Sequence, residues 1–190
     1  MARIAIIVGS TRTNRLTPAV AQWVLEQANQ RDTASYDLID LIDIELPFLD
    51  EPVSPMQGNY AHEHTKAWAS VVAQYDGFVF VVPEYNHSFP GVLKNAIDFL
   101  FAEWNDKAAG IVTLGGTAGG ARAAEQLRLV LAEVRIADVQ SSVALSLRYD
   151  FEDWTVFAPT APQEKALAMT LDQVESWSEA FRTVRSVPVA

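Results

Sequence analysis

The chain has 190 residues, a hydrophobic fraction of 49% and a formal net charge of −10. These values fit one domain over residues 1–190 with enough apolar residues for a core. The negative charge argues against a nucleic-acid or anionic-membrane partner, and the absence of cysteine excludes disulfides, thiolate metal ligands and a cysteine nucleophile. The chain opens with an apolar run of strand length rather than a signal peptide, and we expect a cytoplasmic protein with no membrane segment.

Short apolar runs alternate with amphipathic segments, the pattern of a parallel sheet covered by helices. The sequence predicts strands near residues 3–8, 36–42, 77–82, 108–114 and 139–147. It predicts a helix from about Thr17, helices over 61–75, 91–102 and 121–134, and a final helix with an apolar stripe of Leu167, Leu171, Val174, Trp177, Phe181 and Val184. Residues 46–59, with three prolines, and the stretch around Pro159 and Pro162 are expected to be irregular.

The loop after the first expected strand combines charge with free backbone amides. Residues 9–15 read Gly-Ser-Thr-Arg-Thr-Asn-Arg and lead into a helix, whose amino terminus attracts phosphate. Ser10 and Asn14 can add neutral hydrogen bonds, and Arg12 and Arg15 charge-assisted ones. The loop lacks both G-x-x-x-x-G-K-[ST] and G-x-G-x-x-G, so a flavin monophosphate fits better than a dinucleotide. The alternative is a capped helix start with two surface arginines.

Two further loops follow the third and fourth expected strands. Residues 83–98 read PEYNHSFPGVLKNAID and offer a rigid backbone, an aromatic face and side-chain amides to a flat polar ligand. Residues 115–120 read GGTAGG, and glycine has no side chain to keep such a ligand away from the backbone. The alternative for the first of these loops is a proline-rich turn before a helix, with Tyr85 as a half-buried aromatic residue.

In these motifs the chain resembles the NADPH-dependent FMN reductase family. The patterns GSTR-x-x-R and PEYN-x-S-x-PG-x-LKNAID carry the resemblance, which continues through the glycine loop and residues 122–128 and covers most of residues 1 to about 145. Thr13-Asn14 stands where relatives often have Pro-Gly. The implied fold is a flavodoxin-like doubly wound sheet of five parallel strands in the order 2-1-3-4-5, with helices on both faces. Its first, third and fourth strands would end around one crevice, where open α/β sheets bind ligands.

The resemblance implies an FMN-dependent oxidoreductase. NADPH or NADH would donate a hydride through FMN to a small-molecule acceptor such as a quinone, an azo compound, a metal oxyanion or free flavin. No protein residue would be catalytic, because the flavin carries the chemistry. The expected cofactor-binding residues are Ser10, Arg12, Asn14, Arg15, Pro83, Glu84, Tyr85, Asn86, Ser88, Gly115 and Gly116.

The family also implies a homodimer or homotetramer. The many apolar residues of the expected helix 91–102 favour the same conclusion, because they exceed what one buried face requires.

Several other interpretations remain open. The chain could be a flavodoxin-like electron carrier without NAD(P)H turnover of its own, its acidic surface docking on basic partners, or a relative that no longer binds flavin. His62 and His64 lack a third ligand, and we expect no metal. Arg122 could face the phosphate of the nucleotide, although an ordinary surface arginine is favoured, and His87 could touch substrate or face water.

Overall fold

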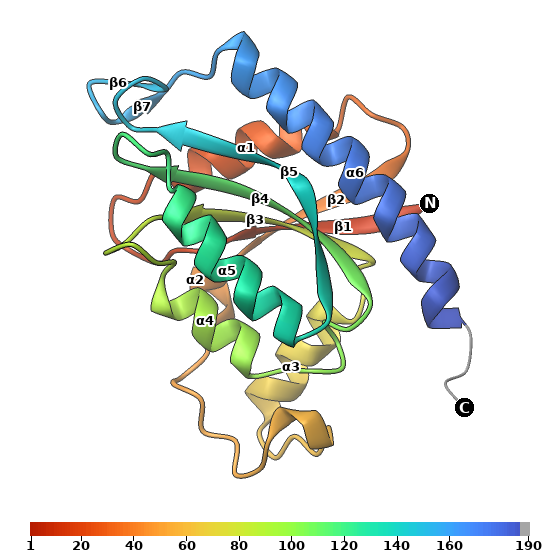
Figure 1. The fold of residues 1–190 in the computed structure, drawn as a ribbon. Coiled ribbons are helices and arrows are strands. Elements are labelled where there is room, and N and C mark those ends of the chain that lie inside the picture. The colour runs from red at the N-terminus through yellow and green to blue at the C-terminus, as the bar shows by residue number, and fades with distance from the viewer. Residues whose placement is uncertain (187–190) are drawn as a thin grey trace.

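The computed structural model describes residues 1–186, and a parallel sheet of five strands in the order β2-β1-β3-β4-β5 forms its centre (Figure 1). The strands are β1 (Ala2–Val8), β2 (Ala34–Asp40), β3 (Gly77–Pro83), β4 (Lys107–Gly115) and β5 (Ile136–Ser146). Each overlaps a strand expected from the sequence, and the expected order is confirmed.

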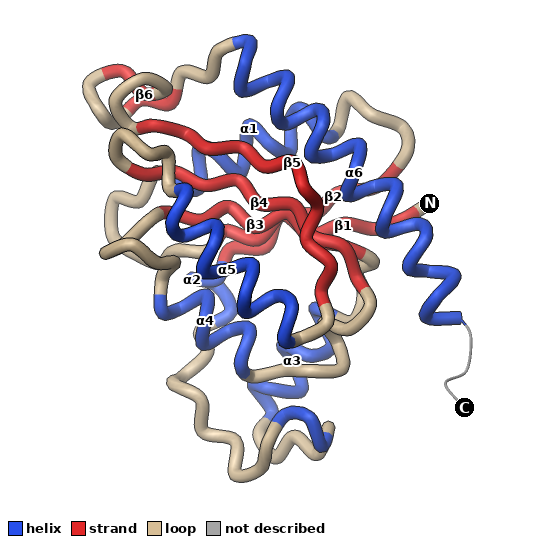
Figure 2. The backbone as a smooth tube through the Cα atoms, in the orientation of Figure 1, coloured by secondary structure: helices blue, strands red, loops and turns tan. Residues whose placement is uncertain are grey.

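Six α-helices connect or follow these strands in the described part of the chain (Figure 2). They are α1 (Thr17–Ala28), α2 (Leu41–Ile44), α3 (Glu63–Val72), α4 (Gly91–Asp98), α5 (Ala121–Glu133) and α6 (Ala161–Ser186), with a short 3-10 helix, η1 (Pro55–Gln57), in the irregular segment between α2 and α3. Helices α3 and α4 are shorter than expected, because the chain turns after Val72 and after Asp98. No helix within residues 1–186 is long and apolar enough to cross a membrane.

Alternating side chains of the strands face opposite sides of the sheet and build two separate cores. On one side, Ile4 and Ile6 of β1 pack with the buried residues of α1 and α6. On the other side, Ile7 of β1 packs with α3, α4 and α5, around the aromatic residues Trp68 and Trp104. The first and last helices therefore share one face of the sheet, and the helices between them cover the other (Figure 1).

The last helix buries a stripe that differs from the predicted one. Leu167, Leu171 and Val174 are buried as expected, but Trp177 and Val184 are 41% and 51% exposed. The small, fully buried Ser178 takes the next inward position, because α6 approaches Gly77 of β3 so closely that a Cβ atom on that glycine would lie 2.1 Å from Ser178 Oγ. Small residues at this contact leave no room for an inward tryptophan.

The stretch around Pro159 and Pro162 also contains structure that the sequence did not predict. Strands β6 (Phe151–Glu152) and β7 (Val156–Phe157) form a small antiparallel hairpin before α6. Its base is anchored in the protein, because the Phe157 ring packs against Phe151 and edge-on against Trp23 of α1, with centroid distances of 5.1 and 5.2 Å.

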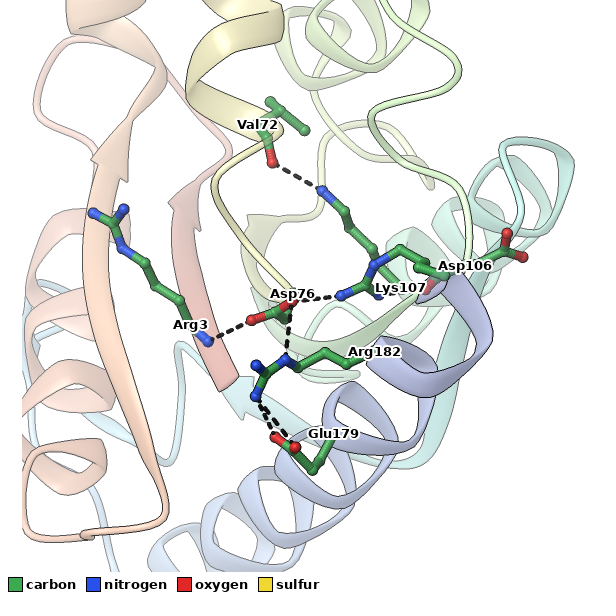
Figure 3. Close-up of polar contacts among 8 residues, drawn as sticks. Arg3, Val72, Asp76, Asp106, Lys107, Glu179 and Arg182 are labelled. Atoms are coloured by element: carbon green, nitrogen blue, oxygen red, sulfur yellow. Dashed lines mark hydrogen bonds and ion pairs between the residues drawn. The ribbon is translucent and has the colours of Figure 1, made fainter. Parts of the chain in front are cut away.

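Charged side chains gather where the strands of the sheet begin (Figure 3). Asp76 accepts hydrogen bonds from Arg185 (2.5 Å) and from the backbone N–H of Arg3 (3.0 Å). Lys107, which is 4% exposed, donates to the carbonyl oxygen of Val72 (3.0 Å), and its Nζ lies 5.4 Å from the centroid of the Phe78 ring. Burial, with a smaller contribution from nearby Arg185, lowers the pKa of Lys107 to about 8.

This buried lysine should make stability depend on pH in the alkaline range. Between about pH 8 and pH 10 the unfolded chain holds a proton on Lys107 that the folded chain has released, so the free energy of unfolding should rise with pH, on the order of 1–2 kcal/mol. Denaturant unfolding at a series of pH values should show this rise in the wild-type protein and not in Lys107→Met, which keeps the apolar stem. Parallel pH profiles for the two proteins would contradict the prediction.

Candidate functional site

Three loops leave the carboxyl ends of neighbouring strands and meet at one edge of the sheet (Figure 1). Hydrogen bonds continue the parallel ladder beyond the paired strands: Gly9 N–H donates to Val81 O (2.9 Å) and Glu84 N–H to Leu114 O (2.8 Å). The loops border a cavity of about 340 Å³, a size typical of small-molecule sites. The crevice predicted from the strand order is therefore present.

Eight of the eleven predicted cofactor-binding residues line this cavity: Arg12, Asn14, Arg15, Pro83, Glu84, Tyr85, Gly115 and Gly116. The other three, Ser10, Asn86 and Ser88, do not line it. Ser10 is 1% exposed, and its hydroxyl lies 2.9 Å from the hydroxyl of Tyr85, so it links the first loop to the second.

The loop after β1 presents donors to the cavity. Asn14 has φ 57°, a left-handed conformation that asparagine tolerates better than most residues, and it can therefore replace the glycine that relatives often carry there. Arg15 pairs with Asp40 at the end of β2 (2.5 Å), whereas the exposed Arg12 forms no ion pair among residues 1–186. Two atoms, Arg15 Nε and Thr17 Oγ1, are buried without a hydrogen-bond partner within the described chain. An anionic group in the cavity would supply acceptors for such donors.

The loop after β3 is a tight turn in which some backbone groups form hydrogen bonds with one another. Tyr85 and Ser88 exchange backbone hydrogen bonds of 2.8 and 3.1 Å, and Asn86 and His87 between them have φ 51° and 68°. The N–H groups of Glu84 and Tyr85 already have backbone partners. The N–H groups of Asn86 and His87 have none within residues 1–186.

Glu84 connects the second loop to the third. Its carboxylate accepts from the backbone N–H of Arg122 (3.2 Å) and from the guanidinium of the same residue (3.1 Å), at the first turn of α5. Arg122 is thus paired with Glu84 and holds two loops together. This contact gives Arg122 a structural partner within the protein.

The two leading glycines of the third loop have different roles. A Cβ atom on Gly115 would lie 2.7 Å from the backbone nitrogen of Gly120, so Gly115 is required for the loop to close on itself. A Cβ atom on Gly116 would meet no atom within 4 Å. The fold itself therefore does not require a glycine at position 116, which lines the cavity.

The sequence did not identify six of the lining residues: Leu16, Thr17, Leu114, Leu147, Trp154 and Thr155. Thr17 carried a usable signal, because a hydroxyl in the first turn of a helix after an arginine-bearing loop can face an anion. Trp154 and Thr155 carried none, because strands of two residues have no readable periodicity.

The two histidines considered as metal ligands, His62 and His64, contact each other and an aspartate. The rings of His62 and His64 stack with centroids 5.1 Å apart, and His64 Nε2 lies 2.9 Å from Asp50 Oδ1. Within residues 1–186, no three histidine, aspartate or glutamate side chains are arranged to hold a metal ion.

The strand order and the arginine-bearing loop after β1 define a flavodoxin-like protein. The fold is similar to that of the flavoenzyme NAD(P)H:(acceptor) oxidoreductase FerB of Paracoccus denitrificans, with a TM-score of 0.75 and 20% identity over 95% of this chain and 99% of that chain. The family model for NADPH-dependent FMN reductases matches residues 2–150, and the chain belongs to that family.

Curated relatives agree with this family. The chain is 43% identical over 183 residues to an NAD(P)H-dependent FMN reductase of Schizosaccharomyces pombe, covering 95% of this chain and 91% of that protein. It is 35% identical over 135 residues to a quinone reductase of Escherichia coli, covering 68% of this chain and 69% of that protein.

The open space beside Gly116 gives a direct test of the cavity. Gly116→Val should weaken FMN binding about tenfold, or about 1.4 kcal/mol, because the new side chain occupies space that the ligand needs. The melting temperature without added FMN should not fall, because no protein atom lies within 4 Å of the added Cβ. Isothermal titration calorimetry gives the affinity.

Gly91→Val is the matched control. Its added Cβ would also meet no atom within 4 Å, and Gly91 does not line the cavity. Equal FMN affinity for the two variants would remove Gly116 from the site.

Proposed function

We propose that this chain holds FMN in the cavity at the ends of β1, β3 and β4 and reduces a small acceptor with electrons from NAD(P)H. Membership of the NADPH-dependent FMN reductase family supports the cofactor and the hydride donor. The observation that carries the placement is a set of donors that line the cavity and have no partner within residues 1–186: the guanidinium of Arg12, which forms no ion pair there, Arg15 Nε and Thr17 Oγ1.

The loop after β1 would bind the phosphate of FMN. No side chain of the described residues caps the amino end of α1, so its free N–H groups and positive dipole end face the same region. Arg12 would add charge-assisted hydrogen bonds, and Arg15 would do so while its other nitrogen keeps the ion pair with Asp40.

The loops after β3 and β4 would hold the ring system. Tyr85 offers an aromatic face, and the open backbone at Gly116 permits close approach from the other loop. The N–H groups of Asn86 and His87 are the available donors near the second loop. Bound FMN supplies the hydride chemistry, and the residues of this chain bind and orient it.

An anaerobic titration of the FMN-loaded protein with NADPH tests the reductase proposal. The visible absorbance of the flavin should bleach rapidly to the two-electron reduced form, and NADH should be tested in parallel. Steady-state kinetics with a quinone should then give parallel double-reciprocal lines, because donor and acceptor use the same exposed face in turn. Intersecting lines would contradict that order.

An electron carrier is the second candidate, favoured by the net charge of −10, which suits docking on basic redox partners. A carrier would bind FMN but leave it oxidised when NADPH or NADH is added. A chain that binds no FMN at all would be a relative that has lost the cofactor.

Arg12→Ala tests the phosphate site most cleanly, because Arg12 has no ion pair to lose within residues 1–186. FMN affinity should fall by about 1.5–3 kcal/mol through loss of charge-assisted hydrogen bonds, with little change in riboflavin affinity, since riboflavin has no phosphate. Lys66→Ala removes the same charge from the exposed side of α3 and should leave both affinities unchanged. Equal losses for FMN and riboflavin would place Arg12 elsewhere in the site.

The small-molecule acceptor would be a quinone, an azo compound, a metal oxyanion or free flavin. Relatives named as quinone reductases favour the quinone. The cytoplasmic location stays a prediction.

Assembly as a homodimer or homotetramer is also part of the proposal, but the surface that supports it is not the one expected from the sequence. The apolar residues Leu93, Ile97, Phe99 and Leu100, which suggested an interface, are each at most 1% exposed in the protein's own core. Exposed apolar side chains gather instead between α2 and α3, where Phe48 is 92% and Met56 69% exposed. This segment extends away from the sheet (Figure 1) and would present these side chains to a second copy.

Light scattering at micromolar concentration should give at least a dimer mass. Phe48→Asp should shift the mass toward the monomer, because the exposed ring would be lost and a charge placed in the interface. Leu129→Asp alters a 69% exposed apolar residue on α5 and should not change the mass. A monomeric wild-type protein would refute the proposal.

A further inference from the structure

Trp154 lines the cavity from a part of the chain that the family model does not reach. That model ends at residue 150, and Trp154 lies at the tip of the β6–β7 hairpin. Its side chain is one of the large apolar groups that remain exposed, at 57%. Because more than half of the Trp154 side chain is exposed, burial of the indole ring contributes little to holding it beside the cavity.

The backbone at Trp154 is unfavourable for this residue. The N–H of Thr155 donates to Glu152 O (3.0 Å), which closes a four-residue turn with Asp153 and Trp154 at its centre. Both central residues have positive φ, 48° and 62°, as in a type I′ hairpin turn. Glycine is the preferred second central residue of such a turn, and a bulky side chain there is a conformational outlier. Strain of this kind persists at positions where the residue serves a function.

The base of the hairpin fixes where the tip lies. Asp150, 3% exposed, accepts from the N–H of Ser146 (2.7 Å) through its carboxylate and from the N–H of Ala158 (2.9 Å) through its backbone oxygen. Phe157 rests against Trp23 of α1, the helix that starts at the expected phosphate loop. The contacts at the base of the hairpin therefore hold Trp154 beside the cavity, although its left-handed backbone conformation is strained.

We propose that the Trp154 indole is a binding residue of the FMN site, packing directly against the bound cofactor. The inference rests on the proposed placement of FMN in this cavity. Tryptophan offers a wide, rigid aromatic surface with few rotatable bonds, so it contributes contact area to a flat ligand at low entropic cost. Contact with the cofactor would explain why a tryptophan stands at this position, which neither the turn conformation nor burial favours.

The proposal predicts opposite effects of one substitution on stability and on binding. Trp154→Gly should raise the melting temperature of the protein without added FMN by about 2–4 °C, because glycine relieves the strained turn. The same variant should bind FMN about tenfold more weakly in isothermal titration calorimetry, because the aromatic contact is lost. Trp154→Phe, which keeps an aromatic ring, should recover most of the affinity.

Asp153→Gly is the matched control. It changes the adjacent left-handed residue of the same turn, leaves the indole in place and does not alter a residue that lines the cavity. Its FMN affinity should equal that of the wild type.

The outcomes separate this proposal from the one on which it rests. A wild-type protein that binds no FMN overturns both. Wild-type binding with an unchanged affinity in Trp154→Gly overturns the role of Trp154 alone. A fall in melting temperature together with weaker binding in Trp154→Gly assigns the residue to the stability of the hairpin and also overturns it.

Discussion

The register of the parallel sheet is the constraint on which the site depends. Pairing of Val8 with Val81 and of Pro83 with Leu114 makes neighbouring strands end at nearly the same level. The ladder then continues into the loops, where the N–H of Leu147 donates to Gly115 O (2.8 Å) beyond the end of β5. A shift of one residue in any pair would turn every side chain of that strand to the other face, and each core excludes such a shift.

Side-chain bonds between the loops complete this arrangement. Ser10 joins the first loop to Tyr85 of the second, Glu84 joins the second to the third through Arg122, and Arg15 joins the first to the end of β2. Protein groups alone make these bonds, so the positions of the loops are set by the chain itself. A ligand that binds to a site organised in this way loses less affinity to the entropic cost of ordering loops.

The sequence predicted the strands, their order and most of the cavity, because buried parallel strands are apolar runs and the loop motifs follow them directly. It could not tell that the Ser10 hydroxyl is buried against Tyr85, since that contact joins residues 75 positions apart. It also misjudged residues 99–102: apolar composition suggested a surface, but the chain turns after Asp98 and returns Phe99 and Leu100 to the core. The sequence did not predict the hairpin because Phe157 of β7 anchors it on Trp23 of α1, and no local pattern encodes a distant partner.

The sharing of one sheet face by the first and last helices has a consequence for synthesis of the protein. Helix α1 is made early, yet part of its side of the sheet stays uncovered until α6, which spans Ala161–Ser186, has been synthesised. During translation the apolar side chains of β3 and β4 on that face lack their partner, and exposed surface of this kind promotes aggregation. Val79, Val81 and Val112 therefore lack their partner on that face until the residues of α6 have been synthesised.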